Sequence, residues 1–232
     1  MDERSHSPAD GRIPAPVASL RGEDPVRHVG DARSFDGRIR IGVLALQGAF
    51  RAHGQRLARL GVDTQEVRTS RDLAAVDALV MPGGESTTMS NLLTSSGLFD
   101  EVKARLSDGM PVFGTCAGLI LLATEVLDGR PDQRSFGVLD ATVRRNGYGR
   151  QLQSFEADVA VNGRPFHGVF IRAPRIESVG PAVEVLAEHE DVPVLVRQGA
   201  VLAAAFHPEL TEDTRLHEYF LEFVRGHESQ ET

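Results

Sequence analysis

The sequence predicts an α/β fold in which helices flank a doubly wound, mostly parallel β-sheet, with additional strands in the C-terminal half. Three observations support this prediction. Short apolar segments typical of buried parallel strands alternate with helix-like segments over residues 38–123. Glycines follow these strands at the sheet edge where ligands bind in such folds. Residues 138–206 contain short β-like segments, which should extend the sheet or form a small antiparallel patch beside it.

The composition limits the possible partners. The 232 residues suffice for one α/β domain, and acidic residues outnumber basic ones by 33 to 25, which argues against a nucleic-acid partner. No apolar run reaches the ~20 residues of a membrane helix, and the first residues lack the pattern of a secretory signal. One cysteine cannot form an internal disulfide, and no Cys/His cluster has zinc spacing. We expect a cytoplasmic protein with no membrane partner and no bound metal.

The predicted domain begins after an extension. Residues 1–36 are rich in Pro, Gly, Ser, Asp and Arg and predict a disordered N-terminal extension, which leaves residues 37–228 for the folded domain. Its first predicted strands are residues 38–46, 62–67 and 77–82. The first predicted helices are residues 50–60, a segment that ends near residue 93, and residues 98–106. Gly61 suits the end of the first helix.

The second half is predicted to be rich in strands. These cover residues 138–143, 156–161, 169–172, 183–188, 194–197 and 201–206. Thr211 should cap a terminal helix with Glu212 and Asp213 in its first turn. One apolar stripe of that helix contains Leu216, Tyr219, Phe220, Phe223 and Val224.

The only cysteine, Cys116, lies between the strand-like residues 112–113 and the helix-like residues 119–123. Gly114 and Gly118 flank it at the spacing of a strand-turn-helix elbow, which presents a nucleophile on a strained backbone. The N-terminal end of the following helix would stabilise the thiolate. The alternative is a small buried apolar residue with no chemistry.

A histidine and a carboxylate follow the last predicted strand. In extended backbone, His207 and Glu209 would project to the same side, with Pro208 stiffening the link. This arrangement suits a base and its orienting carboxylate, although a lone histidine at a strand end is more often a surface residue. With Cys116 as nucleophile, these side chains predict covalent acyl transfer through a thioester on a small polar amide.

A glycine pair follows the third predicted strand. Gly83 and Gly84 lack Cβ atoms and could direct backbone N–H groups at an oxyanion. The alternative is a plain turn with Ser86 as the helix N-cap. No Gly-Lys-Ser/Thr sequence follows, so this is not a phosphate loop.

These motifs resemble the class I (triad) glutamine amidotransferases, which have a flavodoxin-like fold. Further segments resemble, within that class, the glutaminase subunits of pyridoxal 5′-phosphate synthase. The resemblance spans roughly residues 39–226 and rests on residues 41–48, 82–88, 114–118, 145–146, 149–151, 154–158, 170–174 and 206–213. It implies hydrolysis of L-glutamine to glutamate and ammonia, and transfer of the ammonia to a separate synthase (lyase) subunit that makes the vitamin B6 ring.

The resemblance also implies roles for individual residues. Cys116 would be the nucleophile, His207 the base and Glu209 the residue that orients it. The residues implied in glutamine binding are Gly84, Glu85, Ser86, Arg145, Ile171 and Arg172. Which arginine meets the substrate carboxylate stays open. No cofactor is implied for this chain, because pyridoxal 5′-phosphate is the product of the complex, which is expected to form around a dodecameric lyase core.

We expect the glutaminase to depend on its partner. Gln47 and Gly48 follow the first strand, and the hypothesis is that they complete the oxyanion site only when the partner docks, since glycine permits the needed peptide rotation. Two alternatives stay open at this point. One is a glutaminase that serves another synthase, such as that of histidine biosynthesis, and the other is a non-catalytic redox or stress protein of similar fold.

Overall fold

The computed structural model describes residues 39–147 and 154–228. The predicted extension at residues 1–36 and the motif at residues 149–151 lie outside these ranges. The proposed domain limits of 37 and 228 stay predictions.

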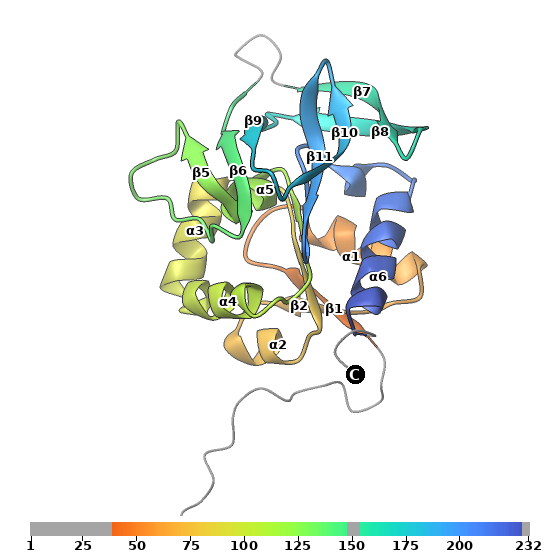
Figure 1. The fold of residues 1–232 in the computed structure, drawn as a ribbon. Coiled ribbons are helices and arrows are strands. Elements are labelled where there is room, and N and C mark those ends of the chain that lie inside the picture. The colour runs from red at the N-terminus through yellow and green to blue at the C-terminus, as the bar shows by residue number, and fades with distance from the viewer. Residues whose placement is uncertain (1–38, 148–153, 229–232) are drawn as a thin grey trace, which may run out of the picture. The chain divides into compact units, whose positions relative to one another are not determined.

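A seven-stranded sheet forms the centre of the described fold (Figure 1). Its order is β10-β11-β12-β4-β3-β1-β2. The strands are β1 (Arg40–Leu44), β2 (Asp63–Val67), β3 (Ala78–Met81), β4 (Val112–Thr115), β10 (Glu184–His189), β11 (Val192–Gln198) and β12 (Val201–Ala204). The five strands from β12 to β2 pair in parallel, whereas β11 and β10 are antiparallel. The predicted doubly wound, mostly parallel sheet is confirmed.

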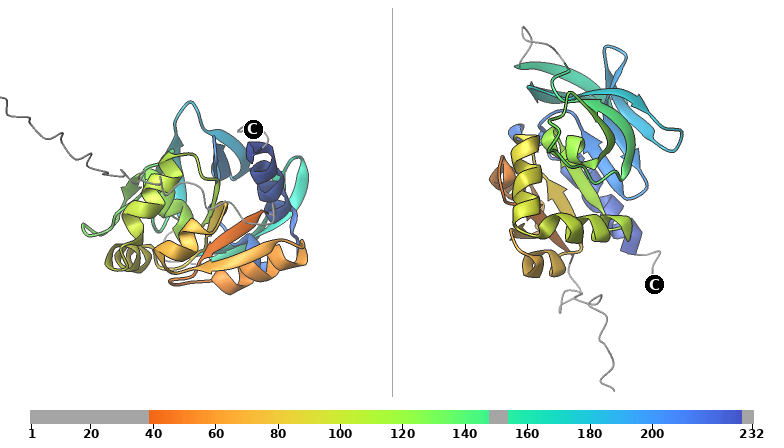
Figure 2. Two further views of the ribbon diagram at one scale, coloured as in Figure 1. Left: turned by 90° about the horizontal axis from the view of Figure 1, so that it is seen from below. Right: turned by 90° about the vertical axis from the view of Figure 1, so that its left-hand side faces the viewer.

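Two smaller sheets lie beside one end of the main sheet (Figure 2). One contains β5 (Ala123–Leu127), β6 (Leu139–Arg144) and β9 (Arg175–Val179). The other is an antiparallel hairpin of β7 (Ser154–Val161) and β8 (Arg164–Ile171). The C-terminal strands therefore show both predicted arrangements. Strands β10 to β12 extend the main sheet, and the others form separate patches beside it.

Helices cover both faces of the main sheet (Figure 1). On one face lie α1 (Phe50–Arg59) and α6 (Arg215–Glu228), and on the other lie α2 (Ser70–Ala74), α3 (Ser86–Ser95), α4 (Leu98–Ser107) and α5 (Ala117–Leu122). Gly61 ends the first helix as predicted, with φ of 72°. Within the described ranges, no helix has the length and apolar character to cross a membrane.

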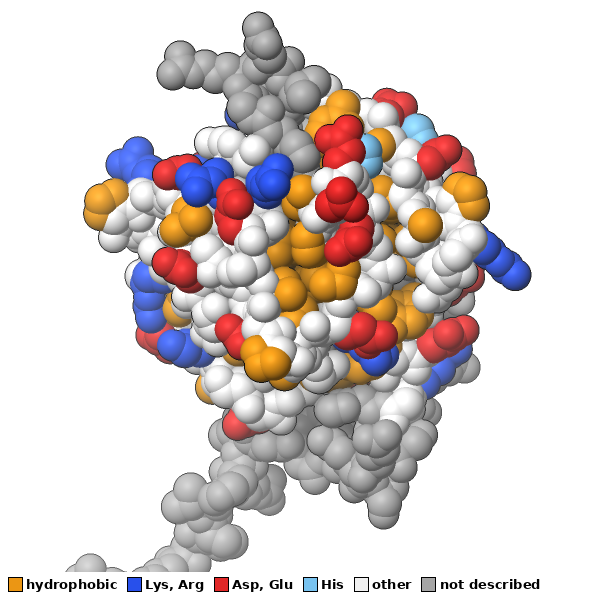
Figure 3. All heavy atoms as spheres, turned by 45° about the horizontal axis from the view of Figure 1, so that its top comes forward, with side chains coloured by type: hydrophobic (Ala, Val, Ile, Leu, Met, Phe, Trp, Pro, Cys, Tyr) orange, Lys and Arg blue, Asp and Glu red, His pale blue; other side chains and the backbone are white. Residues whose placement is uncertain are grey.

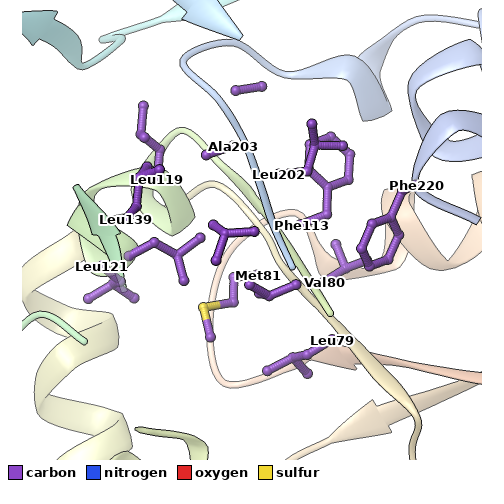
Figure 4. Packing of buried hydrophobic residues seen from close by; sticks show 14 of the residues in the cluster. Leu79, Val80, Met81, Phe113, Leu119, Leu121, Leu139, Leu202, Ala203 and Phe220 are labelled. Atoms are coloured by element: carbon purple, nitrogen blue, oxygen red, sulfur yellow. The ribbon is translucent and has the colours of Figure 1, made fainter. Parts of the chain in front are cut away.

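Apolar side chains from both helical layers pack on the central strands. Figure 4 shows Phe113 of β4 facing Phe220 of α6, while Leu121 of α5 lies on the opposite side near Met81 of β3. The Phe113 and Phe220 ring centroids are 5.7 Å apart, and both side chains are fully buried. Burial of one such side chain contributes about 1.5–3 kcal/mol. The strands that carry the candidate site therefore rest on a rigid core.

The terminal helix begins later than predicted. Its first residue is Arg215, and the backbone N–H of Thr211 instead donates to the carbonyl of Pro208. Asp213 accepts hydrogen bonds from the backbone N–H and the guanidinium of Arg215, which holds the chain in a turn ahead of the helix. The predicted cap at Thr211, with Glu212 and Asp213 in the first turn, is therefore wrong.

Candidate active site

The nucleophile and base candidates come from neighbouring parallel strands. Cys116 directly follows β4, and His207 follows β12 by three residues. Thr115 pairs with Ala204 in the register, and the Cys116 N–H donates to the Ala204 carbonyl at 2.9 Å. Because parallel strands end at the same edge, the two side chains are brought together.

The backbone of Cys116 has the strained geometry of an elbow. Its φ is 49° and its ψ is −101°, which is unusual for a residue with a Cβ and costs about 1–3 kcal/mol. A Cβ on Gly114 would lie 2.8 Å from the carbonyl carbon of Gly118, and a Cβ on Gly118 would run into the Met81 carbonyl. Both glycines are therefore required by close packing, as the elbow spacing predicted.

Glu209 orients His207, although through a different local structure from the one predicted. His207 Nδ1 lies 2.7 Å from Glu209 Oε1, and both residues are buried. The backbone between them is not extended, because Pro208–Leu210 form a single 3₁₀ turn, η1. Proline suits the first position of such a turn, since its φ is preset and it needs no hydrogen-bond acceptor. The predicted contact is present and the predicted extended geometry is wrong.

The electrostatics favour a charged imidazole. Burial opposes the charged form of His207, but the hydrogen bonds and charges of Cys116 and Glu209 outweigh burial and raise the His207 pKa to about 10. Burial likewise opposes ionisation of Glu209, yet His53 and His207 lower the pKa of its carboxyl well below the ordinary range. The site therefore favours a protonated His207 held against an ionised Glu209.

Gly83 makes room for the imidazole. A Cβ at this position would lie 2.9 Å from His207 Nδ1 and 3.3 Å from Cys116 Cβ. The neighbouring Gly84 packs against the side chain of Gln47, whose Oε1 accepts a hydrogen bond from the Glu85 N–H at 3.0 Å. The turn after β3 thus contacts both the triad and the turn after β1.

Gly48 stands against that same turn. Its φ is 89°, and a Cβ there would run into the Gly83 carbonyl oxygen, so only glycine fits. The same carbonyl accepts a hydrogen bond from the Ala49 N–H at 3.2 Å. Gln47 and Gly48 therefore lie against the turn after β3, and their oxyanion or activation role stays a prediction.

Glu85, and not Ser86, is the N-cap of α3. Its carboxylate accepts hydrogen bonds from the backbone N–H groups of Thr87 and Thr88 and is 2.5 Å from Arg145 Nη2. Burial opposes ionisation of Glu85, but the Thr88 and Thr87 hydrogen bonds and the Arg145 charge lower its pKa to about 2. This ion pair supplies one anionic and one cationic side chain. The ammonium group of an amino acid needs an anion as its partner, and the carboxylate group needs a cation.

Gln133 also lies in this region, although the sequence did not predict it as a site residue. Its Oε1 accepts hydrogen bonds from Ser86 Oγ at 3.2 Å and Thr87 Oγ1 at 3.0 Å, and its buried Nε2 has no partner among the described residues. It lies in the loop after β5, where no sequence pattern singled it out.

The end of β8 also lies near the thiol. The Ile171 carbonyl lies 3.9 Å from Cys116 Sγ, and the Ile171 side chain is 38% exposed. The next residue, Arg172, has φ of 43°, a strained value for a residue with a side chain. Both predicted residues therefore lie at the sheet edge where Cys116 is found, with the Arg172 side chain exposed.

A buried histidine pair lies behind Glu209 and was also missed by the sequence analysis. His53 of α1 and His217 of α6 are both fully buried. The helical spacing from Phe50 through His53 to Leu57 placed His53 on the apolar face of its helix, which is the signal that could have identified it.

The described site is built from side chains and backbone groups. No group of three or more His, Cys, Asp or Glu residues within the described ranges is arranged to hold a metal ion. Figure 3 shows acidic side chains next to basic ones around an apolar area on one face, so that face has no continuous basic track for a phosphate backbone.

Comparisons with known proteins agree with this geometry. A Thermus thermophilus protein named pyridoxal 5′-phosphate synthase subunit PdxT is 58% identical over 186 residues, which is 79% of this chain and 97% of that protein. A Frankia alni protein of the same name is 55% identical over 190 residues, covering 81% of this chain and 96% of that protein.

Solved structures show the same fold. A crystal structure of a glutamine amidotransferase matches with a TM-score of 0.75 and 56% identity, and covers 79% of this chain and 98% of that chain. Another glutamine amidotransferase, from Thermotoga maritima, matches with a TM-score of 0.53 at 14% identity, covering 82% of this chain and 86% of that chain, and shares the fold alone. The family model of the SNO glutamine amidotransferases matches residues 43–225. The nucleophile elbow, the histidine with its carboxylate and these matches agree, and the chain belongs to the SNO glutamine amidotransferase family.

Proposed function

We propose that this chain hydrolyses L-glutamine to L-glutamate and ammonia as the glutaminase subunit of a pyridoxal 5′-phosphate synthase. The observation that carries the proposal is the contact of Cys116, His207 and Glu209 at the ends of two neighbouring strands. The named relatives, at 55–58% identity over most of the chain, support the choice of synthase.

The triad residues divide the chemistry among them. His207 takes the proton of the Cys116 thiol, and the thiolate attacks the side-chain carbonyl carbon of glutamine to form a tetrahedral oxyanion. When the C–N bond breaks, His207 delivers the proton to the departing nitrogen, which leaves as ammonia. Water then attacks the thioester with His207 as base, releasing glutamate and restoring the thiol. Glu209 holds the imidazole in place throughout.

The substrate would be held between the turn after β3 and the end of β8. We assign recognition of the glutamine ammonium and carboxylate groups to Glu85 and Arg145, which form an ion pair at the start of α3. Gly84 and Ser86 flank Glu85 in that turn, and Ile171, which Arg172 follows, has its carbonyl 3.9 Å from the thiol. The proposal assigns no cofactor to the chain, because the nucleophile, the base and its orienting group are all side chains.

The proposal includes a dependence on the synthase subunit. Gln47 and Gly48 lie against the Gly83–Gly84 turn, so a partner that contacts the end of β1 can reorient a peptide at the oxyanion site. We place the reaction in the cytoplasm, where a lone nucleophilic thiol stays reduced, and expect assembly on a dodecameric synthase core.

The test measures ammonia release from glutamine by the wild-type chain and by Cys116→Ala, each with and without the synthase subunit. We expect release only from the wild type, and faster release with the partner. Activity that survives in Cys116→Ala would refute the triad assignment. Equal wild-type rates with and without the partner would refute the coupling and leave the triad intact. Co-purification with a histidine-pathway cyclase, in place of the synthase subunit, would refute the choice of synthase.

A further inference from the structure

A buried polar cluster lies directly behind the triad and has no part in the mechanism described above. It consists of His53 from α1, Thr115 from β4 and His217 from α6, each fully buried. His53 Nε2 lies 3.1 Å from Thr115 Oγ1 and 3.3 Å from Glu209 Oε2. His53 Nδ1 lies 3.0 Å from His217 Nε2. His53 thus connects the orienting carboxylate to α6, the other helix on the same face of the sheet.

The donors and acceptors of this cluster can be assigned by elimination. Burial is the main reason that the pKa of His217 falls to about 3, so this ring is neutral and carries one hydrogen. His217 Nδ1 is buried without a partner among the described residues, and an unpaired nitrogen lone pair is less costly there than an unpaired N–H. The hydrogen therefore lies on His217 Nε2 and points to His53 Nδ1. The hydrogen of His53 is then on Nε2, which is hydrogen-bonded to Thr115 Oγ1 and has Glu209 Oε2 as a second neighbour at 3.3 Å.

The opposite assignment fails. If His53 carried its hydrogen on Nδ1, a bare lone pair on Nε2 would face the Glu209 carboxylate. His217 would also have to place its own hydrogen on the buried Nδ1, where no acceptor lies among the described residues. A doubly protonated His53 meets the same objection, because its Nδ1–H would face His217 Nε2 and force the hydrogen of His217 onto the buried Nδ1. The acceptable form of His53 therefore carries its hydrogen on Nε2, on the side of the carboxylate.

Glu209 needs that N–H, because its two oxygens have different surroundings. Oε1 is paired with His207 Nδ1 at 2.7 Å. Oε2 is buried and has no hydrogen bond of good geometry, and the His53 Nε2 at 3.3 Å is its electrostatic contact. Burial opposes ionisation of this carboxyl, and the contacts with His53 and His207 lower its pKa. A buried carboxylate facing only apolar groups on one side would lose much of its charge.

The other charged groups around Glu209 do not replace His53. Arg56 of α1 donates from Nε to the backbone carbonyl of Glu209 at 3.2 Å, and its guanidinium pairs with Glu212. His207 occupies Oε1 and also interacts with Cys116. His217 of α6 faces His53 and not the carboxylate. His53 is therefore the group assigned to Oε2.

We propose that His53 is a positioning residue of the triad, which keeps Glu209 ionised and turned so that Oε1 receives the Nδ1–H of His207. Fixing that hydrogen on Nδ1 makes Nε2 the nitrogen of His207 that takes the thiol proton, which gives the protonated ring that the site favours. This inference rests on the proposed function, since it assigns a role to His53 through Glu209 and His207 and not through contact with the substrate.

The test compares three variants in the complex with the synthase subunit. His53→Leu removes the N–H, His53→Gln keeps an amide N–H at about the reach of Nε2, and His217→Phe disturbs the same buried pair while leaving the His53 N–H facing Glu209. We expect kcat to fall roughly tenfold or more in His53→Leu, with KM for glutamine changed less than about threefold. His53→Gln should recover most of kcat, and His217→Phe should lose much less than His53→Leu.

The pH profile supplies a readout that a packing role would not move. In His53→Leu the carboxyl of Glu209 becomes easier to protonate, so the acid limb of kcat should shift to higher pH by about one unit. The hydrogen on His207 Nδ1 can also be followed by proton NMR in the chain without its partner. Its strongly deshielded resonance should weaken or move in His53→Leu and be retained in His53→Gln.

Three outcomes overturn the proposal. One is an equal loss of kcat and of thermal stability in His53→Leu and His217→Phe, which would make the cluster purely structural. Another is a His53→Gln variant as impaired as His53→Leu at unchanged stability. The third is an unmoved acid limb with an unchanged NMR resonance. A wild-type complex that releases no ammonia refutes the proposed function instead, and the NMR comparison still tests the contact between His53 and Glu209.

Discussion

Gly83 gives a sharp test of the active-site geometry, because its missing side chain leaves the space that the His207 ring occupies. In Gly83→Ala, the new Cβ would lie 2.9 Å from His207 Nδ1 and closer still to Cε1. Ordinary contacts between such atoms are about 3.5–4.0 Å, so the ring would have to move by roughly 1 Å. The ring cannot do so freely, because Glu209 holds Nδ1 at 2.7 Å and the Val169 carbonyl accepts from the His207 backbone N–H at 2.8 Å.

The size of the effect follows from that displacement. A misplacement of about 1 Å in a catalytic group costs roughly 100-fold in rate, which corresponds to about 2.7 kcal/mol of transition-state stabilisation. We therefore expect kcat of Gly83→Ala to fall at least about 100-fold. KM should change less than kcat, because the ring acts on the thiol and not on the ends of the substrate.

The assay is release of ammonia from glutamine in the presence of the synthase subunit, with thermal unfolding measured on the same samples. Gly226→Ala in α6 is the matched control, since no atom lies within 4 Å of the position of its Cβ. The control should retain wild-type activity. If Gly83→Ala folds normally and keeps kcat within about threefold of the wild type, then His207 does not act as the base from the position that the structure gives it.

Three further predictions test other parts of the structure. Glu209→Gln should lower the free energy of unfolding by about 2 kcal/mol at neutral pH. Because the folded-state pKa of Glu209 lies below its ordinary value of 4.5, this stabilisation is present above pH 4.5 and is lost as the pH falls, so urea melts of the two proteins should converge in acid. Arg145→Met should raise KM for glutamine by roughly 10-fold to 100-fold with kcat nearly unchanged, and steady-state kinetics with equal changes in both would contradict the assigned role. Gly54→Ala should stabilise α1 by roughly 0.5–1 kcal/mol, because nothing occupies the space for its Cβ, and an unchanged or lower Tm would contradict this.

Strand and elbow positions were predictable because they depend on local patterns. The apolar segments before Gly48, Gly83 and Cys116 are too short and too apolar for anything but buried parallel strands, and their carboxyl ends meet at one edge by geometry alone. The contact of Cys116 with His207 follows from this rule once β12 joins the same sheet beside β4. The sequence does not predict that β12 pairs with β4, because a hydrophobic pattern does not specify which strands are neighbours.

Short elements were missed or misplaced because weak signals compete there. The five-residue helix α2 begins with a capping box between Thr69 and Asp72, yet it is too short for a periodic apolar pattern. Pro208 is compatible with an extended chain and with the first residue of a 3₁₀ turn, because both accept its fixed φ. The choice between them is made by tertiary contacts, above all by the hydrogen bond from the His207 N–H to the Val169 carbonyl of β8.

The surroundings of the triad were the least predictable part, and His53 shows why. Its helical spacing with Phe50 and Leu57 predicts a buried face, but the same spacing holds for any residue on that stripe. The role of a buried histidine can be inferred only when its neighbours are known. In the neutral ring one nitrogen donates a hydrogen bond and the other accepts one, and the neighbours determine which nitrogen does which. Those neighbours, Glu209 and His217, lie far along the chain and reach His53 only because α1 and α6 cover the same face of the sheet. Substitution at His53 therefore tests the tertiary contacts that hold the catalytic base in place, without changing the local sequence that forms the nucleophile elbow.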